Sequence, residues 1–273
     1  MKKDYIPFSI VFNREVAKDY FWLRLEITEK EHIDIINSIN VGNFATINIE
    51  GFEIFFKRPF SIFDFDPYNG TIDFLYKVIG RATLALSNLP QGYILKVLLP
   101  LGNSFPIIEN KDVIIVAGGI GIAALIKLAE ILRSKNNKIE FFWGIKSKEN
   151  FFFSTRLEEI SDNLYITTED GSLGEQGLIT NSLYKFIYQH SKDLSNFIIY
   201  GCGPTPLLRV LSDLSRIHRI PSYLSFENKM ACGIGTCQGC VIKVKEKDRD
   251  TIKYKRVCYD GPIFRGEDVV YEL

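Results

Sequence analysis

The sequence lacks an excess of charge of either sign, and it lacks a long hydrophobic run. Its 33 Lys and Arg residues balance 33 Asp and Glu residues, so it has no broad positive field of the kind that nucleic-acid backbones attract. The longest uncharged apolar run, residues 113–126, is shorter than the roughly 18 to 20 residues that cross a bilayer. We therefore expect neither a nucleic-acid partner nor a membrane span.

A secretory signal is also missing from the N-terminus. Lys2 and Lys3 are followed by no apolar core and no small-residue cleavage site. A cytoplasmic location is the expectation that follows.

Cysteine is nearly absent from residues 1–231, which contain only Cys202. Four more cysteines then follow in a short stretch, at Cys232, Cys237, Cys240 and Cys258. Without an export signal, a disulfide framework is disfavoured. The C-x4-C-x2-C spacing with a distant fourth cysteine is instead typical of a plant-type [2Fe-2S] cluster.

Glycines between these cysteines support that interpretation. Gly233, Gly235 and Gly239 can adopt positive φ and let backbone N–H groups point at the sulfurs, where they stabilise a negative cluster. The alternative is a zinc site with four thiolate ligands. Zinc loops more often have two separate C-x2-C knuckles, and the second knuckle is missing here.

The first hundred residues have the pattern of an antiparallel barrel. Short β-rich segments at residues 21–27, 43–49, 71–78 and 93–99 are separated by turn residues. No long amphipathic helix is evident before residue 100.

The pattern then changes to alternating strands and helices. Residues 111–117 predict a buried strand, residues 118–121 a tight turn, and residues 122–134 a helix. Further strands are predicted at residues 138–143, 164–167 and 196–200, and further helices within residues 178–190 and 206–217. This alternation indicates a doubly wound parallel sheet.

We thus expect a multidomain α/β plus β protein. The predicted parts are an antiparallel β-barrel at residues 1–103, a doubly wound α/β domain at residues 104–222 and a small iron-sulfur domain at residues 223–273. In the last part the cysteine-rich loop precedes a strand and turn at residues 240–250 and a further segment at residues 251–258.

Two short motifs add candidate cofactor sites. Arg58-Pro59-Phe60-Ser61 lies between two predicted strands, where Arg58 can pair with a pyrophosphate and the Ser61 hydroxyl can reach a flavin ring nitrogen. An ordinary strand end is the alternative. Gly118-Gly119-Ile120-Gly121 joins a buried strand to a helix, a place for an anionic ligand, although glycine-rich turns are also common for packing reasons.

Cys202 follows an apolar strand in Gly201-Cys202-Gly203-Pro204. Doubly wound sheets bind ligands at the carboxyl ends of their strands, so this segment is a further candidate. The simpler interpretation is a small buried hydrophobic residue.

Taken in order, these motifs resemble those of the ferredoxin-reductase superfamily, in which an FAD-binding barrel precedes a nicotinamide-nucleotide domain and some branches add a C-terminal [2Fe-2S] domain. The resemblance is strongest to one branch, the electron-transfer subunits of NAD-dependent dihydroorotate dehydrogenases, and it covers essentially the whole chain. It is carried by residues 100–105, 169–172, 200–204, 225–240, 256–258 and 260–264, with the letters PLGNSF, EDGS, YGCGP, SFENKMACGIGTCQGC, RVC and DGPIF.

The resemblance implies residues for each cofactor. Ser61 is expected near the reactive flavin nitrogen, and Ala82 stands where the family's usual Gly-x-Gly-Thr has its second glycine. The residues implied for FAD are Arg58, Pro59, Phe60, Ser61, Leu75, Tyr76, Lys77, Ala82 and Thr83. The residues implied for NAD are Gly118, Gly119, Gly121, Cys202, Gly203 and Pro204. The implied cluster ligands are Cys232, Cys237, Cys240 and Cys258.

The resemblance also implies an oxidoreductase subunit of pyrimidine biosynthesis. Electrons would pass from the flavin of a partner through [2Fe-2S] and FAD to NAD, while dihydroorotate is oxidised on the separate, FMN-containing catalytic subunit. FAD is expected in the middle because a nicotinamide exchanges two electrons as hydride, a cluster exchanges one, and a flavin can do both. No catalytic acid or base is required of this chain, and a hetero-oligomer is expected.

Three rival functions remain open from the residues. They are a related NAD(P)H-dependent subunit serving a ferredoxin, sulfur or hydrogenase partner, a stand-alone reductase that forms a homo-oligomer, and a zinc-stabilised binding module without redox activity. The family favours NAD over NADP. Lys146 and Lys148 can approach a 2′-phosphate, although a solvated turn is the commoner role for such lysines.

Overall fold

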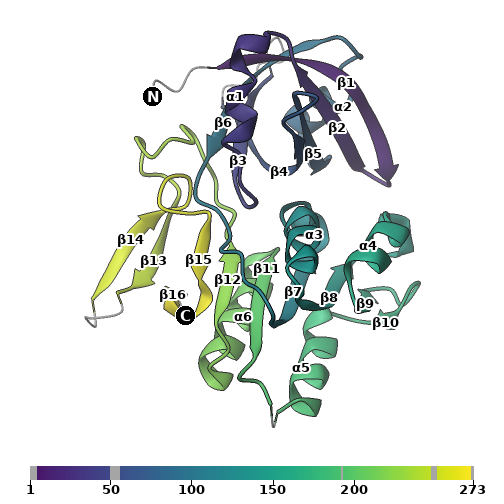
Figure 1. Cartoon of the computed structure of the whole chain (residues 1–273), viewed down its shortest axis with the longest axis vertical. Helices are drawn as coiled ribbons and strands as arrows, with labels where there is room; N and C mark the ends of the chain where they lie inside the picture. Colours follow the sequence, from purple (N-terminus) through teal and green to yellow (C-terminus); the bar gives the residue numbers. More distant parts are fainter. Residues whose placement is uncertain (1–4, 50–55, 192, 247–250, 272–273) are drawn as a thin grey trace.

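The computed structural model describes residues 5–49, 56–191, 193–246 and 251–271. These residues form a closed barrel, a seven-stranded sheet and a three-stranded sheet, which Figure 1 shows at the top, bottom and left of the molecule. The predicted fold class is confirmed.

The barrel is antiparallel, with the strand order β1-β2-β5-β4-β3-β6. Its interior is apolar because alternate residues along each strand, such as Leu23 and Leu25, point inward and are fully buried. The strands are β1 (Ile6–Ala17), β2 (Tyr20–Ile27), β3 (Phe44–Asn48), β4 (Arg58–Asp66), β5 (Thr71–Lys77) and β6 (Ile94–Leu101), and the short helices are η1 (Lys30–His32), α1 (Asp34–Asn37) and α2 (Arg81–Ser87).

The second sheet has the order β10-β9-β8-β7-β11-β12-β15. All its pairs are parallel except the last, in which β15 runs antiparallel to β12. Its strands are β7 (Asp112–Gly118), β8 (Lys138–Ile145), β9 (Asn163–Thr168), β10 (Glu175–Gln176), β11 (Phe197–Cys202), β12 (Ser222–Ser225) and β15 (Ile263–Arg265). From β7 the chain adds β8, β9 and β10 on one side, and it then returns to add β11 and β12 on the other side of β7. Parallel sheets of this kind bind ligands where the strand order reverses in this way, here between β7 and β11.

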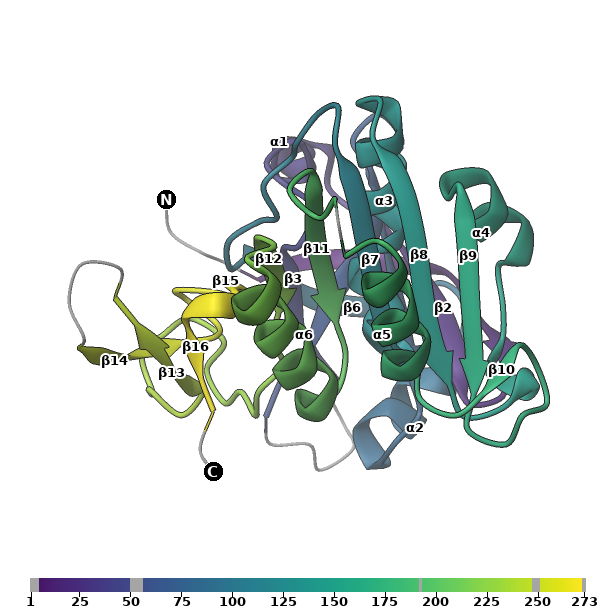
Figure 2. The same cartoon turned by 90° about the horizontal axis from the view of Figure 1, so that it is seen from below.

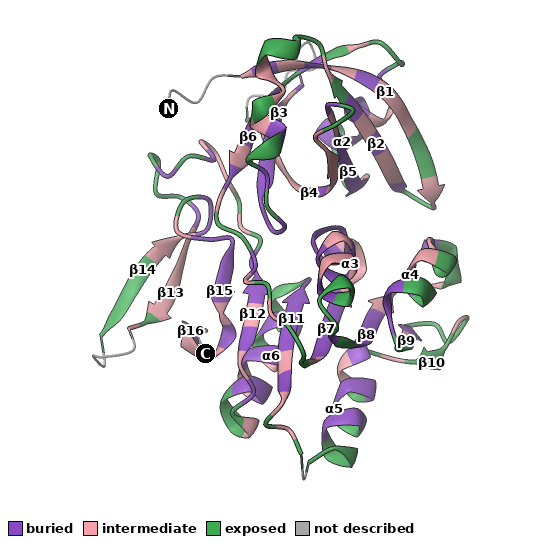
Figure 3. Ribbon diagram, in the orientation of Figure 1, coloured by how far each residue is buried: buried purple, intermediate pink, exposed green. Residues whose placement is uncertain are grey.

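Helices cover both faces of this sheet (Figure 2). In β7, Val113 and Ile115 pack on the side of α3 and α4, while Ile114 and Val116 pack on the side of α5 and α6. Burial on both faces explains why β7 is a continuous apolar run, and Figure 3 shows its buried residues at the centre of the sheet. The helices are η2 (Gly119–Ala124), α3 (Ile126–Ser134), η3 (Lys148–Asn150), α4 (Ser154–Ile160), α5 (Ile179–Gln189) and α6 (Thr205–His218).

Two local predictions need correction. The helix predicted from residue 122 begins as the 3-10 helix η2, and its regular α-helical part starts only at Ile126. Arg58-Pro59-Phe60-Ser61 does not lie between strands, because it forms the first four residues of β4 and pairs with β3. Pro59 is tolerated there near the beginning of the strand.

The last part of the chain forms a small sheet of β14 (Ile252–Arg256), β13 (Val241–Lys245) and β16 (Val269–Val270), with η4 (Gly266–Asp268) before its last strand. The turn predicted within residues 240–250 falls partly on residues 247–250, which lie outside the described residues. No helix in the described part of the chain is long and apolar enough to cross a membrane.

Candidate functional site

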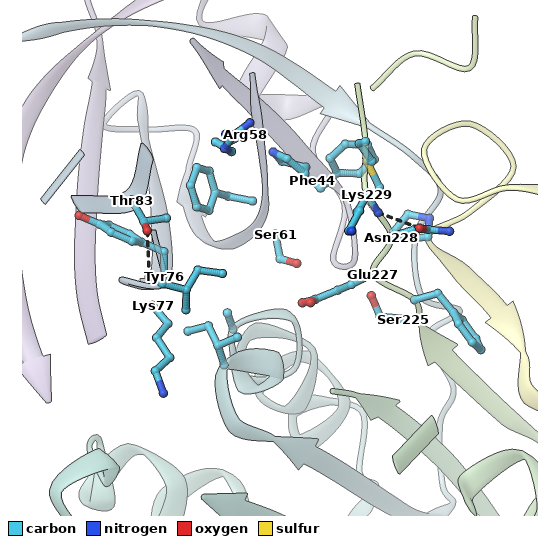
Figure 4. Close-up of a pocket in the computed structure, with 18 of the residues that line it drawn as sticks. Phe44, Arg58, Ser61, Tyr76, Lys77, Thr83, Ser225, Glu227, Asn228 and Lys229 are labelled. Carbon is cyan, nitrogen blue, oxygen red and sulfur yellow. Dashed lines mark hydrogen bonds between the residues drawn. The ribbon is translucent and has the colours of Figure 1, made fainter. Parts of the chain in front are cut away.

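A pocket of about 650 Å³ lies where the barrel meets the nucleotide sheet. Its walls include β4, β5 and α2 of the barrel, η2, and residues 225–231, which begin at the last residue of β12 (Figure 4). The sequence-predicted residues that line it are Arg58, Pro59, Phe60, Ser61, Leu75, Tyr76, Lys77 and Thr83.

The register of β3 against β4 sets the positions on the barrel wall. Ser61 pairs with Phe44 and Arg58 with Ile47, so the whole Arg-Pro-Phe-Ser segment follows the pocket edge. The Phe60 ring makes an edge contact with Tyr76, with ring centroids 5.7 Å apart. This contact joins β4 to β5 beneath the pocket.

Tyr76 and Thr83 are held by hydrogen bonds. The Tyr76 hydroxyl donates to Asn13 Oδ1 at 3.0 Å, and burial raises the pKa of this phenol, so it stays neutral. The Thr83 hydroxyl accepts the backbone N–H groups of Ile79 and Gly80 at 3.0 and 3.2 Å. Thr83 thereby satisfies free N–H groups at the start of α2.

Ala82, the departure from the family pattern, is not among the residues that line the pocket. It is 6% exposed and packs into the barrel core. Its methyl group therefore fills space inside the barrel.

The glycine turn and the Gly-Cys-Gly-Pro segment pack against each other. A Cβ at Gly121 would overlap the Cys202 carbonyl oxygen and lie 2.8 Å from Gly203 N, and one at Gly118 would lie 2.8 Å from Pro204 Cδ. Glycine is required here for close packing between the ends of β7 and β11. Ile120 and Ala123 line the pocket, whereas the predicted glycines and Cys202 do not appear in its lining.

Cys202 is 1% exposed. Burial, together with the nearby Glu227 carboxyl group, raises the pKa of its thiol. Cys202 is therefore a neutral thiol at physiological pH, and in the sheet it pairs with Ser225, which lines the pocket.

Glu227 is a pocket residue that sequence reasoning missed. Figure 4 shows its carboxyl group pointing into the pocket near Ser61 and Ser225. The surrounding protein raises the pKa of this carboxyl group by desolvating its charged form. The sequence did contain a signal for this site: Glu227 is an acidic residue that follows a strand by two positions, and ligands bind at the carboxyl ends of such strands.

The cysteine loop brings its four thiols into two neighbouring pairs. Cys237 N–H points at the sulfur of Cys232 at 3.4 Å, and Cys258 N–H points at the sulfur of Cys240 at 3.4 Å. Gly235 N–H donates to the sulfur of Cys258 at 3.1 Å. These donors create the positive environment that a bound negative cluster needs.

The turn geometry differs from the prediction at one position. Gly233 and Gly235 have positive φ, at 70° and 86°, as predicted. Gly239 is not among the positive-φ residues, and Gln238 takes that conformation instead, at 55°. A Cβ at Gly233 would lie 2.8 Å from Thr46 Cγ2, so the loop packs directly on β3.

The thiols differ in acidity. Burial raises the pKa of the Cys232 thiol, but backbone N–H groups of Cys237 and Ile234 outweigh it and lower that pKa to about 6. Burial and the neighbouring Cys240 raise the pKa of the Cys258 thiol to about 12. A bound metal would have to displace the proton from Cys258.

The sulfur spacing tests the fit of a cluster against a single zinc ion. Zn–S bonds of about 2.3 Å place tetrahedral sulfurs only about 3.8 Å apart. In the described part of the chain, no three of the cysteine sulfurs lie within 4.8 Å of one another. Two separated pairs of thiolates fit a two-iron cluster, in which each iron takes two of them.

Comparison with known protein families agrees with this arrangement. Residues 227–270 match the iron-sulfur cluster binding domain of dihydroorotate dehydrogenase B, and residues 115–213 match the oxidoreductase NAD-binding domain.

Among solved structures, the NADH-dependent reduced ferredoxin-NADP oxidoreductase of flavin-based electron bifurcation is 30% identical, with a TM-score of 0.81, and the match covers 96% of this chain and 89% of that one. The ferredoxin NADP+ reductase of Neisseria gonorrhoeae, with bound FAD and NADP, matches 82% of this chain and 100% of that one at 17% identity and a TM-score of 0.66, which shows the fold alone.

Curated relatives match over nearly their whole length. The dihydroorotate dehydrogenase B (NAD(+)) electron transfer subunit of Caldanaerobacter subterraneus is 37% identical over 96% of this chain and 97% of its own. The corresponding homolog of Aquifex aeolicus is 31% identical over the same shares. The chain therefore belongs to the family of dihydroorotate dehydrogenase B (NAD(+)) electron-transfer subunits.

Proposed function

We propose that this chain passes electrons between a dihydroorotate-oxidising partner and NAD. One observation carries the proposal most directly: the pocket wall formed by residues 225–231 continues without interruption into Cys232, the first of the four thiols. A pocket for one redox group and a site for another thus share a stretch of chain. Another part of the wall is η2, which directly follows β7 of the nucleotide sheet.

The residues divide among three cofactors. We assign FAD to Arg58–Ser61, Leu75–Lys77 and the start of α2 at Ala82 and Thr83. NAD is assigned to the glycine turn and the Cys202–Pro204 segment, and the [2Fe-2S] cluster to Cys232, Cys237, Cys240 and Cys258. When bound, the nicotinamide exchanges hydride, the cluster exchanges single electrons, and the flavin can do both.

The chain's own residues bind, orient and exclude water. Arg58 and Lys77 supply positive charge at the pocket for a pyrophosphate or other anionic group. The apolar side chains of Phe44, Phe226 and Met230 shield the pocket from solvent. No side chain is assigned as a catalytic acid or base.

The partner is an FMN-containing dihydroorotate dehydrogenase catalytic subunit, with which this chain forms a hetero-oligomer in the cytoplasm. Cys237 is exposed, and Ile234 in the same loop is 42% exposed, so residues 232–240 offer a face through which a partner can approach the cluster. We retain residues 1–103, 104–222 and 223–273 as the FAD, NAD and cluster domains, with most of β12 and all of β15 in the last range completing the nucleotide sheet.

Replacing Cys240 tests the order of transfer. Cys240→Ser should remove the cluster because it takes away one of four ligands. Dihydroorotate, added to the complex with the partner, should then no longer reduce NAD, while NADH should still reduce bound FAD. Iron content, the paramagnetic signal of the reduced cluster and the flavin absorbance measure these outcomes.

Thr236→Ala is the matched control, since it changes the same loop without removing a sulfur. It should retain iron and transfer. If NADH fails to reduce FAD in a stably folded Cys240→Ser protein, or if dihydroorotate still reduces NAD, the proposed order is wrong.

A further inference from the structure

Asn103 lies in the linker between β6 and β7, outside the pocket and the cysteine loop. Its side chain nevertheless makes long-range hydrogen bonds to the last part of the chain, more than 150 residues further on. The residue therefore has a structural partner that neither cofactor site explains.

The Asn103 side chain pairs with backbone groups in the manner of a β-strand. Its Oδ1 accepts Ile263 N–H at 2.9 Å, while its Nδ2 donates to Ile263 O at 2.8 Å and to Asp260 O at 3.3 Å. The backbone N–H of Asn103 donates to Gly261 O at 2.6 Å. One residue thus holds residues 260–263 through four hydrogen bonds.

The same linker is bonded to the barrel on its other side. The buried Asn43 donates through Nδ2 to Gly102 O at 3.2 Å and to Asn103 O at 3.1 Å. Phe105 N–H donates to Val41 O at 2.9 Å. Asn103 therefore connects residues 260–263 to the barrel.

Packing leaves this joint little freedom. Gly102 has a φ of 75°, and a Cβ there would lie 2.5 Å from Pro262 Cδ and 3.0 Å from Phe44 Cε1. Both Pro262 and Phe44 line the pocket. Phe226, which also lines the pocket, donates its N–H to Pro262 O at 2.9 Å.

The held segment begins two residues after Cys258 and contains Pro262, which lines the pocket. It therefore joins a cluster thiol to the flavin pocket. We propose that Asn103 is a positioning residue that sets the distance and orientation between the cluster and the flavin pocket. This inference rests on the proposed function.

The test uses the full chain loaded with FAD and the cluster. In this test NADH would first deliver two electrons as hydride to the flavin. The measured step would then pass one electron from the flavin to a ferric iron of the cluster. The flavin would lose one electron and the cluster would gain one. In Asn103→Ala, cluster reduction should slow by about tenfold or more, since rates that depend on geometry respond strongly to ångström shifts. Reduction of FAD by NADH should stay unchanged.

A second readout does not depend on the cofactors. Hydrogen exchange of the peptide that contains Ile263 should become faster in Asn103→Ala, because its N–H loses its acceptor. Asn103→Asp, which replaces the donor Nδ2 by an oxygen facing Ile263 O, should also slow cluster reduction. Asn69→Ala, which removes a local bond to Asp66 in a barrel turn, is the matched control and should change neither measurement.

The outcomes separate the two proposals. Unaltered cluster reduction and unaltered exchange in Asn103→Ala would overturn the role of Asn103 and leave the proposed function standing. Absence of electron transfer from flavin to cluster in the unmodified protein would instead contradict the proposed function.

Discussion

At the residue scale, the contact between Gly121 and Cys202 shows how the absence of a side chain shapes the nucleotide turn. Backbone atoms of Cys202 and Gly203 occupy the space that a Cβ at Gly121 would need. Backbone atoms move less easily than the ends of side chains, so this position tolerates little relaxation.

Gly121→Ala should therefore destabilise the protein by about 1 to 3 kcal/mol, the usual range for overpacking. Chemical denaturation of the cofactor-free chain measures the change in the free energy of unfolding. Gly80→Ala is the control, because its φ is extended and no atom lies within 4 Å of the added Cβ. Equal unfolding midpoints for the two variants would contradict the packing argument.

Glu227 gives a prediction for pH dependence at the same scale. Glu227 is exposed at the pocket, but the protein atoms around its carboxyl group partly desolvate it and raise its pKa above the ordinary value of 4.5. In the window just above 4.5 the folded state therefore binds more protons than the unfolded state. The contribution of Glu227 to stability is thus present below pH 4.5 and is lost as pH rises through the raised pKa.

Glu227→Gln should remove this loss. The cofactor-free variant should be more stable than the unmodified chain above the window, and the difference should shrink as pH falls below 4.5. Free energies of unfolding measured across this pH range test the prediction, with Glu159→Gln on the exposed face of α4 as control. Parallel curves for Glu227→Gln and the unmodified chain would refute it.

At the scale of elements, a charged network joins the barrel to two helices of the nucleotide sheet. Arg156 of α4 donates to Glu130 of α3 at 2.7 Å and to Asp64 of β4 at 2.9 Å. Lys127 contacts Asp64 at 2.7 Å. Burial acts to raise the pKa of the Asp64 carboxyl group, but Lys127 and Arg156 outweigh it, and that pKa is lowered.

Arg156→Met should cost about 1 to 3 kcal/mol of stability, because it leaves half-buried carboxylates without their donor. The cost should become smaller when Asp64→Asn is present as well. A double-mutant cycle in denaturant measures this coupling. Additive effects of the two substitutions would show that the pair contributes no coupling.

At the scale of the whole molecule, the proposed function makes the exposed face of the cysteine loop the place where a partner delivers electrons to the cluster. Ile234 lies in that loop and is 42% exposed, whereas Ile252 on β14 is similarly exposed, at 52%, but lies outside the loop. The two residues therefore form a matched pair for locating the interface.

Ile234→Glu should weaken binding of the FMN-containing catalytic subunit by about tenfold, equivalent to about 1.4 kcal/mol, without loss of iron. Ile252→Glu should bind nearly as well as the unmodified chain. Titration calorimetry with the purified catalytic subunit measures both affinities. An equal loss in both variants, or a loss only in Ile252→Glu, would place the interface elsewhere.

The amino-acid sequence by itself determined the features that depend on local spacing. Cys232, Cys237 and Cys240 share one loop, so their separation along the chain limits their separation in space, and the cluster type follows from it. The apolar run of β7 similarly indicated a strand buried on both faces.

Only the tertiary structure decided which distant residues meet. Glu227 enters the pocket beside Ser61, and Asn103 reaches Ile263, because barrel, sheet and cysteine loop close on one another. β15 likewise joins the edge of the nucleotide sheet after the chain has passed through the cysteine loop. No local pattern encodes such pairings, since they depend on the packing of elements that are far apart in the sequence.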